Sequence, residues 1–535
     1  MVACISGYGY AVVLEWAPKM WESIKFEIWN GENEEFISSS LRVINALGKK
    51  LSINIQDWDD ELNVVARFII GILKECTEKI LDSKQRFMLS TGRIIHAISC
   101  SSLFMFSWVP KKVLPSLLTL WDDLSLKSEK TSLLDVFNRG LQARNDVEAQ
   151  LMVAFKSKIL DQDTIKYCIE GGEKILKNLA PFKERLVEVY WSALTESATD
   201  SQDHPVFRIN TIQGLASLMK FKEFLSDMER GTIIESLNGI VLAPNQRDDV
   251  LDSAVVALRT ISMADPERFH TITLPNFMSK FADITDKEEI FRILDPLMQI
   301  ACTSPCTFEV TSESDSKFMV FNAYQQCLLG LVSEAKLETQ TSRVAYLLGA
   351  ILRGMELFDA ALKEDSAAAV SPSSTSHPYF FIVYGLFTKF VGVRGERTNA
   401  YVGLLIDLSK FNDAKEIIEL HQVLSLLGDI ATLALRSSQT TPENNFLIGP
   451  GYTGPSRIWT LFCDVGKELQ GLGKSQMNVQ NGPQDKCLVM VLSKSLAAGV
   501  RREVSTLSKC NKNHLLRCHR IRTDWDSTSE RLQKL

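Results

Sequence analysis

The middle of the chain reads Leu215-Ala-Ser-Leu218, then Leu258-Arg-Thr-Ile261, then Leu297-Met-Gln-Ile300. The three copies begin 43 and 39 residues apart, and the last two share a proline shortly after their isoleucine. Helix pairs that repeat about every 40–47 residues are typical of HEAT and armadillo proteins. The spacing therefore predicts an all-α fold, a HEAT-repeat α-solenoid in which antiparallel helix pairs form an armadillo-like superhelix.

A second helix is expected after each of the first two copies, around Ile233–Val241 and Leu274–Phe281. One helix pair cannot bury both of its faces, so successive pairs must stack and share a core. Leu215, Leu258 and Leu297 are then expected at equivalent buried positions. The alternative is a non-repetitive helical bundle in which the spacing arises by chance.

The same helical period continues toward the N-terminus, where Trp21, Ile24 and Ile28 form one apolar stripe. Two further stripes are predicted at Phe36, Leu41, Ile44 and Leu47, and at Leu62, Val65, Phe68, Ile69, Ile72 and Leu73. Strand-like alternation is scarce, so the helical array is expected from about residue 8 to residue 435 with almost no sheet.

Composition narrows the classes of function. The 535 residues carry 59 Lys and Arg against 65 Asp and Glu, a net charge of -6. A duplex-binding protein usually shows a basic footprint, so direct nucleic-acid binding is not expected. The 11 cysteines are scattered in apolar stretches, which favours a reducing compartment, nucleus and cytoplasm, over a disulfide framework.

Neither a secretory leader nor a membrane segment is expected. The first charge in the chain is the acidic Glu15, whereas a signal peptide begins with basic residues. The uncharged run Ile94–Pro110 contains a histidine and four serines and is shorter than the roughly 20 apolar residues of a span.

The one cofactor-like motif is Gly449-Pro-Gly-Tyr-Thr-Gly454, which matches the dinucleotide fingerprint G-x-G-x-x-G. The preceding residues are mostly polar, no βαβ unit surrounds the motif, and Pro450 lacks a backbone donor. A plain Gly/Pro loop is the preferred interpretation. An enzyme that binds a nucleotide here is the least favoured function, and no catalytic or cofactor-binding residue is predicted.

Metal-binding residue types also occur without a convincing ligand set. Cys302 and Cys306 lack the second pair that zinc sites and iron–sulfur clusters need. Four further candidates are close together near the C-terminus but fit no zinc module: Cys510, His514, Cys518 and His519. The lone His96 lies in an apolar helix and reads as a core histidine. No metal site and no cofactor are predicted.

Tryptophans are the best candidates for protein contacts, because interface hot spots favour Trp, Tyr and Arg. Four of them lie near the N-terminus and are predicted to bind partners: Trp16, Trp21, Trp29 and Trp58. The alternative is that they are ordinary inter-helix core.

Tyr10–Ser52 resembles a segment of the MMS-nineteen family, the large HEAT-repeat proteins of nucleotide excision repair. The residues that carry this resemblance are Trp21-Glu-Ser-Ile-Lys-Phe-Glu-Ile28 and Leu41-Arg-Val-Ile-Asn-Ala46. Phe207–Lys220 resembles the start of that family's C-terminal HEAT region, and the resemblance covers roughly Val2–Phe446.

The resemblance implies a targeting scaffold of cytosolic iron–sulfur protein assembly. Such a scaffold binds the assembly complex and apo iron–sulfur proteins, among them repair helicases and polymerases, and needs no cluster of its own. Family members are considerably longer, so the resemblance also implies a partial chain. Another HEAT adaptor, such as a nuclear transport receptor, is the alternative.

The resemblance and the composition together predict five segments. These are helical repeats at 1–145 resembling the end of the family's N-terminal region, HEAT repeats at 146–364 resembling the start of its C-terminal region, a Ser/Ala/Pro-rich disordered linker at 365–377, further helical repeats at 378–475, and an irregular basic tail at 476–535. Within the repeats, Cys306–Lys317 is polar and is expected to be an inter-repeat loop.

Overall fold

The computed structural model describes residues 1–52, 59–83, 86–156, 173–199, 204–221, 224–244, 246–281, 284–303, 311–366, 379–394, 401–404 and 414–440. The chain forms two compact units, Met1–Ala264 and Asp265–Leu535. The predicted segment boundaries do not coincide with this division and stay predictions. The predicted tail at 476–535 lies outside the described residues.

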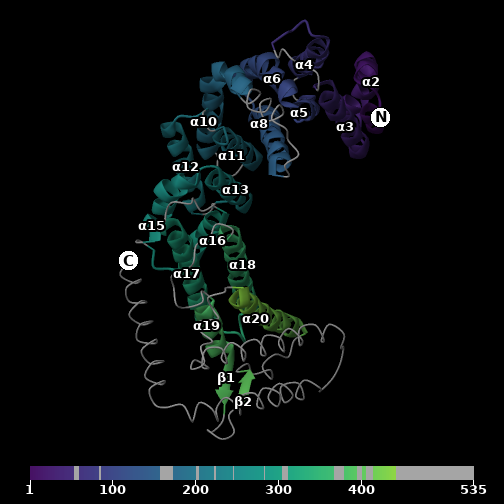
Figure 1. The fold of residues 1–535 in the computed structure, drawn as a ribbon. Coiled ribbons are helices and arrows are strands. Elements are labelled where there is room, and N and C mark those ends of the chain that lie inside the picture. Colours follow the sequence, from purple (N-terminus) through teal and green to yellow (C-terminus); the bar gives the residue numbers. More distant parts are fainter. Residues whose placement is uncertain are drawn as a thin grey trace. The chain divides into compact units, whose positions relative to one another are not determined.

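The first unit contains helices throughout its described part (Figure 1). They are α1 (Val2–Gly7), α2 (Tyr10–Asn30), α3 (Glu34–Leu51), α4 (Val64–Ser83), α5 (Met88–Ser99), α6 (Leu103–Lys112), α7 (Leu114–Asp123), α8 (Lys127–Lys156), the 3-10 turn η2 (Ala180–Phe182), α10 (Lys183–Thr199), α11 (Pro205–Met219), α12 (Asp227–Leu242) and α13 (Asp248–Ala264).

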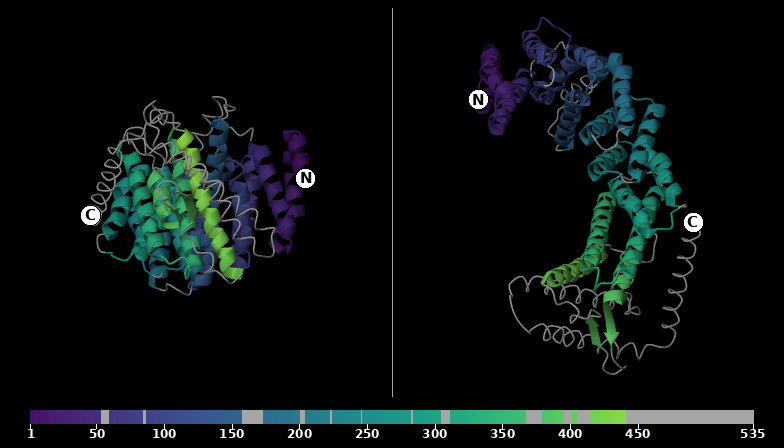
Figure 2. Two further views of the ribbon diagram at one scale, coloured as in Figure 1. Left: turned by 90° about the horizontal axis from the view of Figure 1, so that it is seen from below. Right: turned by 180° about the vertical axis from the view of Figure 1, so that it is seen from behind.

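These helices form two layers. One layer consists of α3, α5, α8, α11 and α13, each packed against the next. The helices that precede them in the chain form the other layer, so that α2 packs on α3, α4 on α5, α7 on α8, α10 on α11 and α12 on α13. The N-terminal helices run side by side in both views of Figure 2. This alternation is the stacking that a repeat of helix pairs requires.

The second unit repeats the alternation on a smaller scale. Its elements are α14 (Pro266–Arg268), the π-helical turn η3 (Phe269–Thr273), α15 (Leu274–Phe281), α16 (Lys287–Thr303), α17 (Thr311–Glu334), α18 (Thr341–Ser366), α19 (Phe380–Phe390), β1 (Val391–Arg394), β2 (Tyr401–Leu404) and α20 (Ala414–Thr440). Helices α16, α18 and α20 pack in succession, while α15, α17 and α19 precede and contact them.

The three leucines of the sequence repeat are buried, each within its own unit. Leu215 on α11, Leu258 on α13 and Leu297 on α16 are 0%, 1% and 0% exposed. The expected second helices also form, as α12 and α15. The prediction of an all-α fold built from stacked helix pairs is confirmed.

Three expectations need comment. The hairpin of β1 and β2, with Gly392 paired to Gly403, was not predicted, although valine and tyrosine favour strands. The expected loop Cys306–Lys317 is wrong in its second half, because α17 begins at Thr311. Its polar Thr, Ser, Glu and Asp residues are favoured in a first helical turn. The predicted linker Asp365–His377 begins inside α18 at its last two residues and otherwise lies outside the described residues.

Buried polar bridges join the helices of the first unit. Asn138 on α8 donates from Nδ2 to the backbone carbonyl of Asn210 on α11 at 2.7 Å, and accepts at Oδ1 from the Tyr190 hydroxyl at 2.8 Å. Asn210 returns a bond to the carbonyl of Thr131 at 3.1 Å. Gly214 lies against the Tyr190 ring. Because buried polar atoms require partners, this network fixes the register between neighbouring helix pairs.

Candidate protein-binding surface

A polar cluster on the inner face of helix α2 joins this helix to α4. The buried Trp21 donates from Nε1 to Oε2 of Glu75 on α4 at 3.1 Å. Lys25 lies between Glu22, at 2.7 Å, and the other oxygen of Glu75, at 3.3 Å. The hydrogen bond that Lys25 donates to Glu22, with the charge of Glu75, raises the pKa of Lys25. These contacts fix which face of α2 points away from the stack.

Trp29, about two helical turns after Trp21, is also part of the core. Its ring meets Phe87 edge to face, with centroids 5.7 Å apart. The Lys79 ammonium lies 5.0 Å from the Phe87 centroid and covers this aromatic pair. Edge-to-face pairs stabilise a core beyond the area they bury, so Trp29 has a structural role in this conformation.

Trp16 lies on the opposite, outward face of α2. It is 48% exposed, and the Lys19 ammonium lies 4.3 Å from its ring centroid. Val12 precedes Trp16 by one helical turn on this face. Phe26, 71% exposed, lies almost three turns further along the outward side, beyond the exposed Lys19 and Ser23. The three exposed apolar side chains Val12, Trp16 and Phe26 are called the α2 face below.

The structure thus separates the four predicted tryptophans. Trp21 and Trp29 are buried, Trp16 is on the surface, and Trp58 lies outside the described residues. Of the three described tryptophans, Trp16 is the one whose side chain is exposed to a partner, and the prediction for Trp58 stays a prediction. The sequence held a signal for this, since Trp16 falls off the Trp21–Ile24–Ile28 stripe, whereas Val12 and Phe26 were missed.

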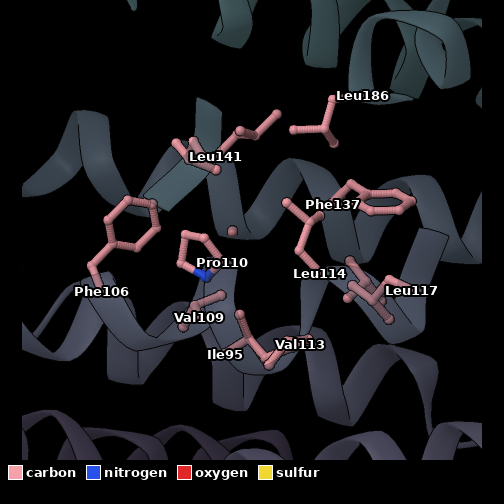
Figure 3. A pocket seen from close by; sticks show the side chains of 13 residues that line it. Ile95, Phe106, Val109, Pro110, Val113, Leu114, Leu117, Phe137, Leu141 and Leu186 are labelled. Atoms are coloured by element: carbon pink, nitrogen blue, oxygen red, sulfur yellow. The ribbon is translucent and has the colours of Figure 1, made fainter. Parts of the chain in front are cut away.

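An apolar hollow lies between the helices of the first unit (Figure 3). Its empty volume is about 410 Å³, counting the part open to solvent, and its wall is almost wholly hydrocarbon. Pro110, Leu141 and Leu186 reach it from α6, α8 and α10. No polar group on its wall could orient a small molecule, so the hollow reads as imperfect inter-helix packing.

The candidate metal and cofactor residues of the sequence are not brought together within the described part of the chain. No group of three or more His, Cys, Asp or Glu among them could hold a metal ion. Cys302 is buried with its Sγ 3.9 Å from the sulfur of Met298, and Cys306 lies outside the described residues. His96 is half-buried beside Cys100, with Nε2 3.5 Å from Sγ. The Gly449–Gly454 motif and the Cys510–His519 group also fall outside the described part of the chain.

None of the helices searched in the described ranges is long and apolar enough to cross a bilayer.

Comparison with known proteins points to one group of relatives. No protein-family model matches the chain. The MMS19 nucleotide excision repair protein homolog of Xenopus tropicalis is 23% identical over 275 residues, which is 51% of this chain and 24% of that protein. The homolog of Xenopus laevis is 23% identical over 273 residues, with the same shares. The human homolog is 20% identical over 221 residues, 41% of this chain and 19% of its own.

Solved structures add little. A designed armadillo repeat protein matches with a TM-score of 0.24 and 14% identity, covering 53% of this chain and 99% of its own. An engineered protein matches with a TM-score of 0.22 and 14% identity, covering 79% and 93%. Scores this low carry no argument. The chain spans about a quarter of the length of the frog proteins it matches. Over about half of its own length, the chain is related to the MMS19 nucleotide excision repair proteins.

Proposed function

We propose that this chain is a non-catalytic adaptor in DNA repair, which works by binding other proteins. The observation that carries the proposal is its relation to the MMS19 nucleotide excision repair homologs, in a fold made of stacked helix pairs. Stacked pairs offer extended surface rather than an enclosed site. The α2 face offers two large exposed aromatic side chains, Trp16 and Phe26, for such contacts.

The specific role we propose is delivery in cytosolic iron–sulfur protein assembly, in the nucleus and the cytoplasm. The clients are apo iron–sulfur proteins of repair, replication and transcription, such as repair helicases and polymerases, and the other partner is the assembly targeting complex. The chain itself carries no stoichiometric cluster in this proposal. Its net charge of -6 favours clients with basic patches.

The test is a binding measurement with the purified full chain. An iron–sulfur repair helicase in its apo form is compared with a repair helicase that binds no cluster. We expect the apo client to bind with a Kd on the order of micromolar or tighter, the range that standard-size interfaces span. Binding should weaken as salt rises, and it should be weaker for Trp16→Ala. Iron analysis of the anaerobically purified chain should read near zero.

Two outcomes would overturn this role. Equal binding of both helicases by a folded chain would mean that cluster proteins are not recognised as such. Iron at a cluster stoichiometry, lost on changing Cys302 and Cys306, would make the chain a cluster carrier rather than an adaptor.

A further inference from the structure

A short acidic turn lies on a group of three lysines in the first unit. Asp59 accepts from Lys111 through Oδ1 at 2.6 Å, and its Oδ2 accepts from Lys174. Glu61 accepts from Lys112 at 2.9 Å. Two carboxylates of one turn thus contact three ammonium groups, which come from the end of α6 and from the helical residues 173–179.

The geometry of the turn presents these two carboxylates to the same side. Asp60, between them, uses its own side chain locally, since its Oδ1 accepts from the backbone N–H of Leu62 at 2.8 Å. Its backbone carbonyl accepts from Asn63 at 3.2 Å. Asp and Asn commonly close turns through such local bonds. The turn therefore presents two carboxylates, one on each side of a bend, as an acidic peptide could also do.

The side chains of the three lysines are more buried than the two carboxylates of the acidic turn. The side chains of Lys111, Lys112 and Lys174 are 28%, 29% and 23% exposed, whereas Asp59 and Glu61 are 52% and 58% exposed. Trp108, fully buried, supports two of the lysines, with Lys111 5.0 Å and Lys112 5.9 Å from its ring. Both ammonium groups therefore lie within cation–π reach of this ring, which helps to hold them beside the turn.

Burial lowers the pKa of Lys111, against the opposing charge of Glu61. The hydrogen bond from Lys112, with its charge, lowers the pKa of Glu61. A pKa held below its usual range keeps the Glu61 carboxylate ionised near neutral pH.

We propose that Lys111, Lys112 and Lys174 form a binding site for an acidic peptide segment of a partner protein, and that Asp59–Glu61 occupies this site as an internal competitor. The turn shows the chemistry that the site accepts: carboxylates on both sides of a tight bend. The chain's overall negative charge makes a nucleic-acid backbone the less favoured ligand. This site is separate from the α2 face and does not depend on the iron–sulfur proposal.

The internal turn and a free peptide would compete for the three lysines through contacts that are individually weak. Ion pairs that are open to solvent on one side are individually weak, because water and salt screen them. A covalently attached segment nevertheless acts at an effective concentration of roughly millimolar. A free peptide should therefore bind the native chain poorly, and should bind much better once the internal carboxylates are neutralised.

The experiment uses the full chain and the fluorescein-labelled peptide Asp-Asp-Glu-Leu, amidated at its C-terminus, with fluorescence anisotropy at low salt. The double variant Asp59→Asn/Glu61→Gln should bind the peptide at least about tenfold more tightly than the native chain. Adding Lys111→Met, Lys112→Met and Lys174→Met to that variant should abolish binding. The matched control Lys74→Met, which removes an exposed lysine of α4, should leave it unchanged.

Equal affinity in the native chain and the double variant would overturn the proposal and leave the turn as a structural tether. Stronger competition by tripolyphosphate or single-stranded DNA than by the unlabelled peptide would overturn the peptide assignment. Circular dichroism checks the fold of each variant. If the triple lysine change unfolds the chain, the test uses Lys112→Met alone, which removes only the partner of Glu61. This single change must weaken peptide binding by about threefold. An unchanged affinity would count against the site.

Discussion

Gly214 shows how closely neighbouring helices pack at the scale of one residue. A Cβ at this position would lie 1.9 Å from Cε1 of Tyr190, whose hydroxyl holds Asn138. We expect Gly214→Ala to lower the free energy of unfolding by about 1–3 kcal/mol, because the added methyl group must displace a buried ring. Urea denaturation followed by circular dichroism measures this change.

Gly140 provides the matched control. It lies on α8 at the apolar hollow, and an added Cβ would meet only Ile95, at 4.0 Å. Gly140→Ala should raise the free energy of unfolding by about 1 kcal/mol, because alanine is the better helix former. The two substitutions are chemically identical, so a loss of stability in both would contradict this account of Gly214.

The cysteines differ in reactivity for reasons of burial. Cys4 is exposed, whereas Cys76 is buried and Cys327 is partly buried. Burial raises the pKa of the Cys76 thiol and raises that of Cys327 to about 12, with the nearby acidic side chains adding to the effect. Since the thiolate is the reactive form, iodoacetamide at pH 8 should label Cys4 in the native protein well before the other two. Peptide mass spectrometry reads the order, and early labelling of Cys76 would show that α4 opens.

At this scale the sequence predicted the core better than the surface. Ile24 and Ile28 are buried as their helical period requires, but Phe36 and Leu62 were placed in apolar stripes and are 59% and 77% exposed. Leu62 precedes the first residue of α4, so the helical period does not yet apply to it. Periodicity identifies a face only where the helix exists and where a neighbour covers it.

At the scale of helices, the repeat register makes a direct prediction. Leu215, Leu258 and Leu297 are all fully buried on successive core helices. Replacing any one of them with alanine should lower the free energy of unfolding by about 2–5 kcal/mol through lost burial and the cavity left behind. Chemical denaturation of the three single variants provides the measurement. Val256→Ala on α13, at a position 56% exposed, is the control and should cost well under 1 kcal/mol.

A capping motif can mark the start of a helix in the local sequence, whereas contacts between distant segments leave no such local mark. Ser226-Asp-Met-Glu229 is a capping-box sequence, and the structure has both of its reciprocal bonds at the start of α12. By contrast, Asp59 and Lys174 are 115 residues apart. Nothing in their local sequence marks them as partners, because ion pairs between stacked helices depend on the packing of the whole unit.

For the molecule as a whole, stacking implies that damage stays local. In a chain of helix pairs each pair contacts mainly its neighbours. Gly214→Ala should therefore speed amide hydrogen exchange in α8, α10 and α11, where the strained network lies, and leave α17 and α18 unchanged. Hydrogen exchange with mass spectrometry resolves these helices. A uniform increase across both units would instead indicate one cooperative fold.

Trp16 also makes the α2 face optically visible. Among the tryptophans whose side chains the structure describes, it is the exposed one, and it carries a lysine charge 4.3 Å from its ring. The difference between the native emission spectrum and that of Trp16→Phe isolates its fluorescence, which should peak near the wavelength of indole in water. A protein that docks on this face and removes water from the ring should shift that emission to the blue and protect it from iodide quenching. The helix therefore carries its own reporter for the partner it is proposed to meet, and an unshifted spectrum during binding would place that partner elsewhere.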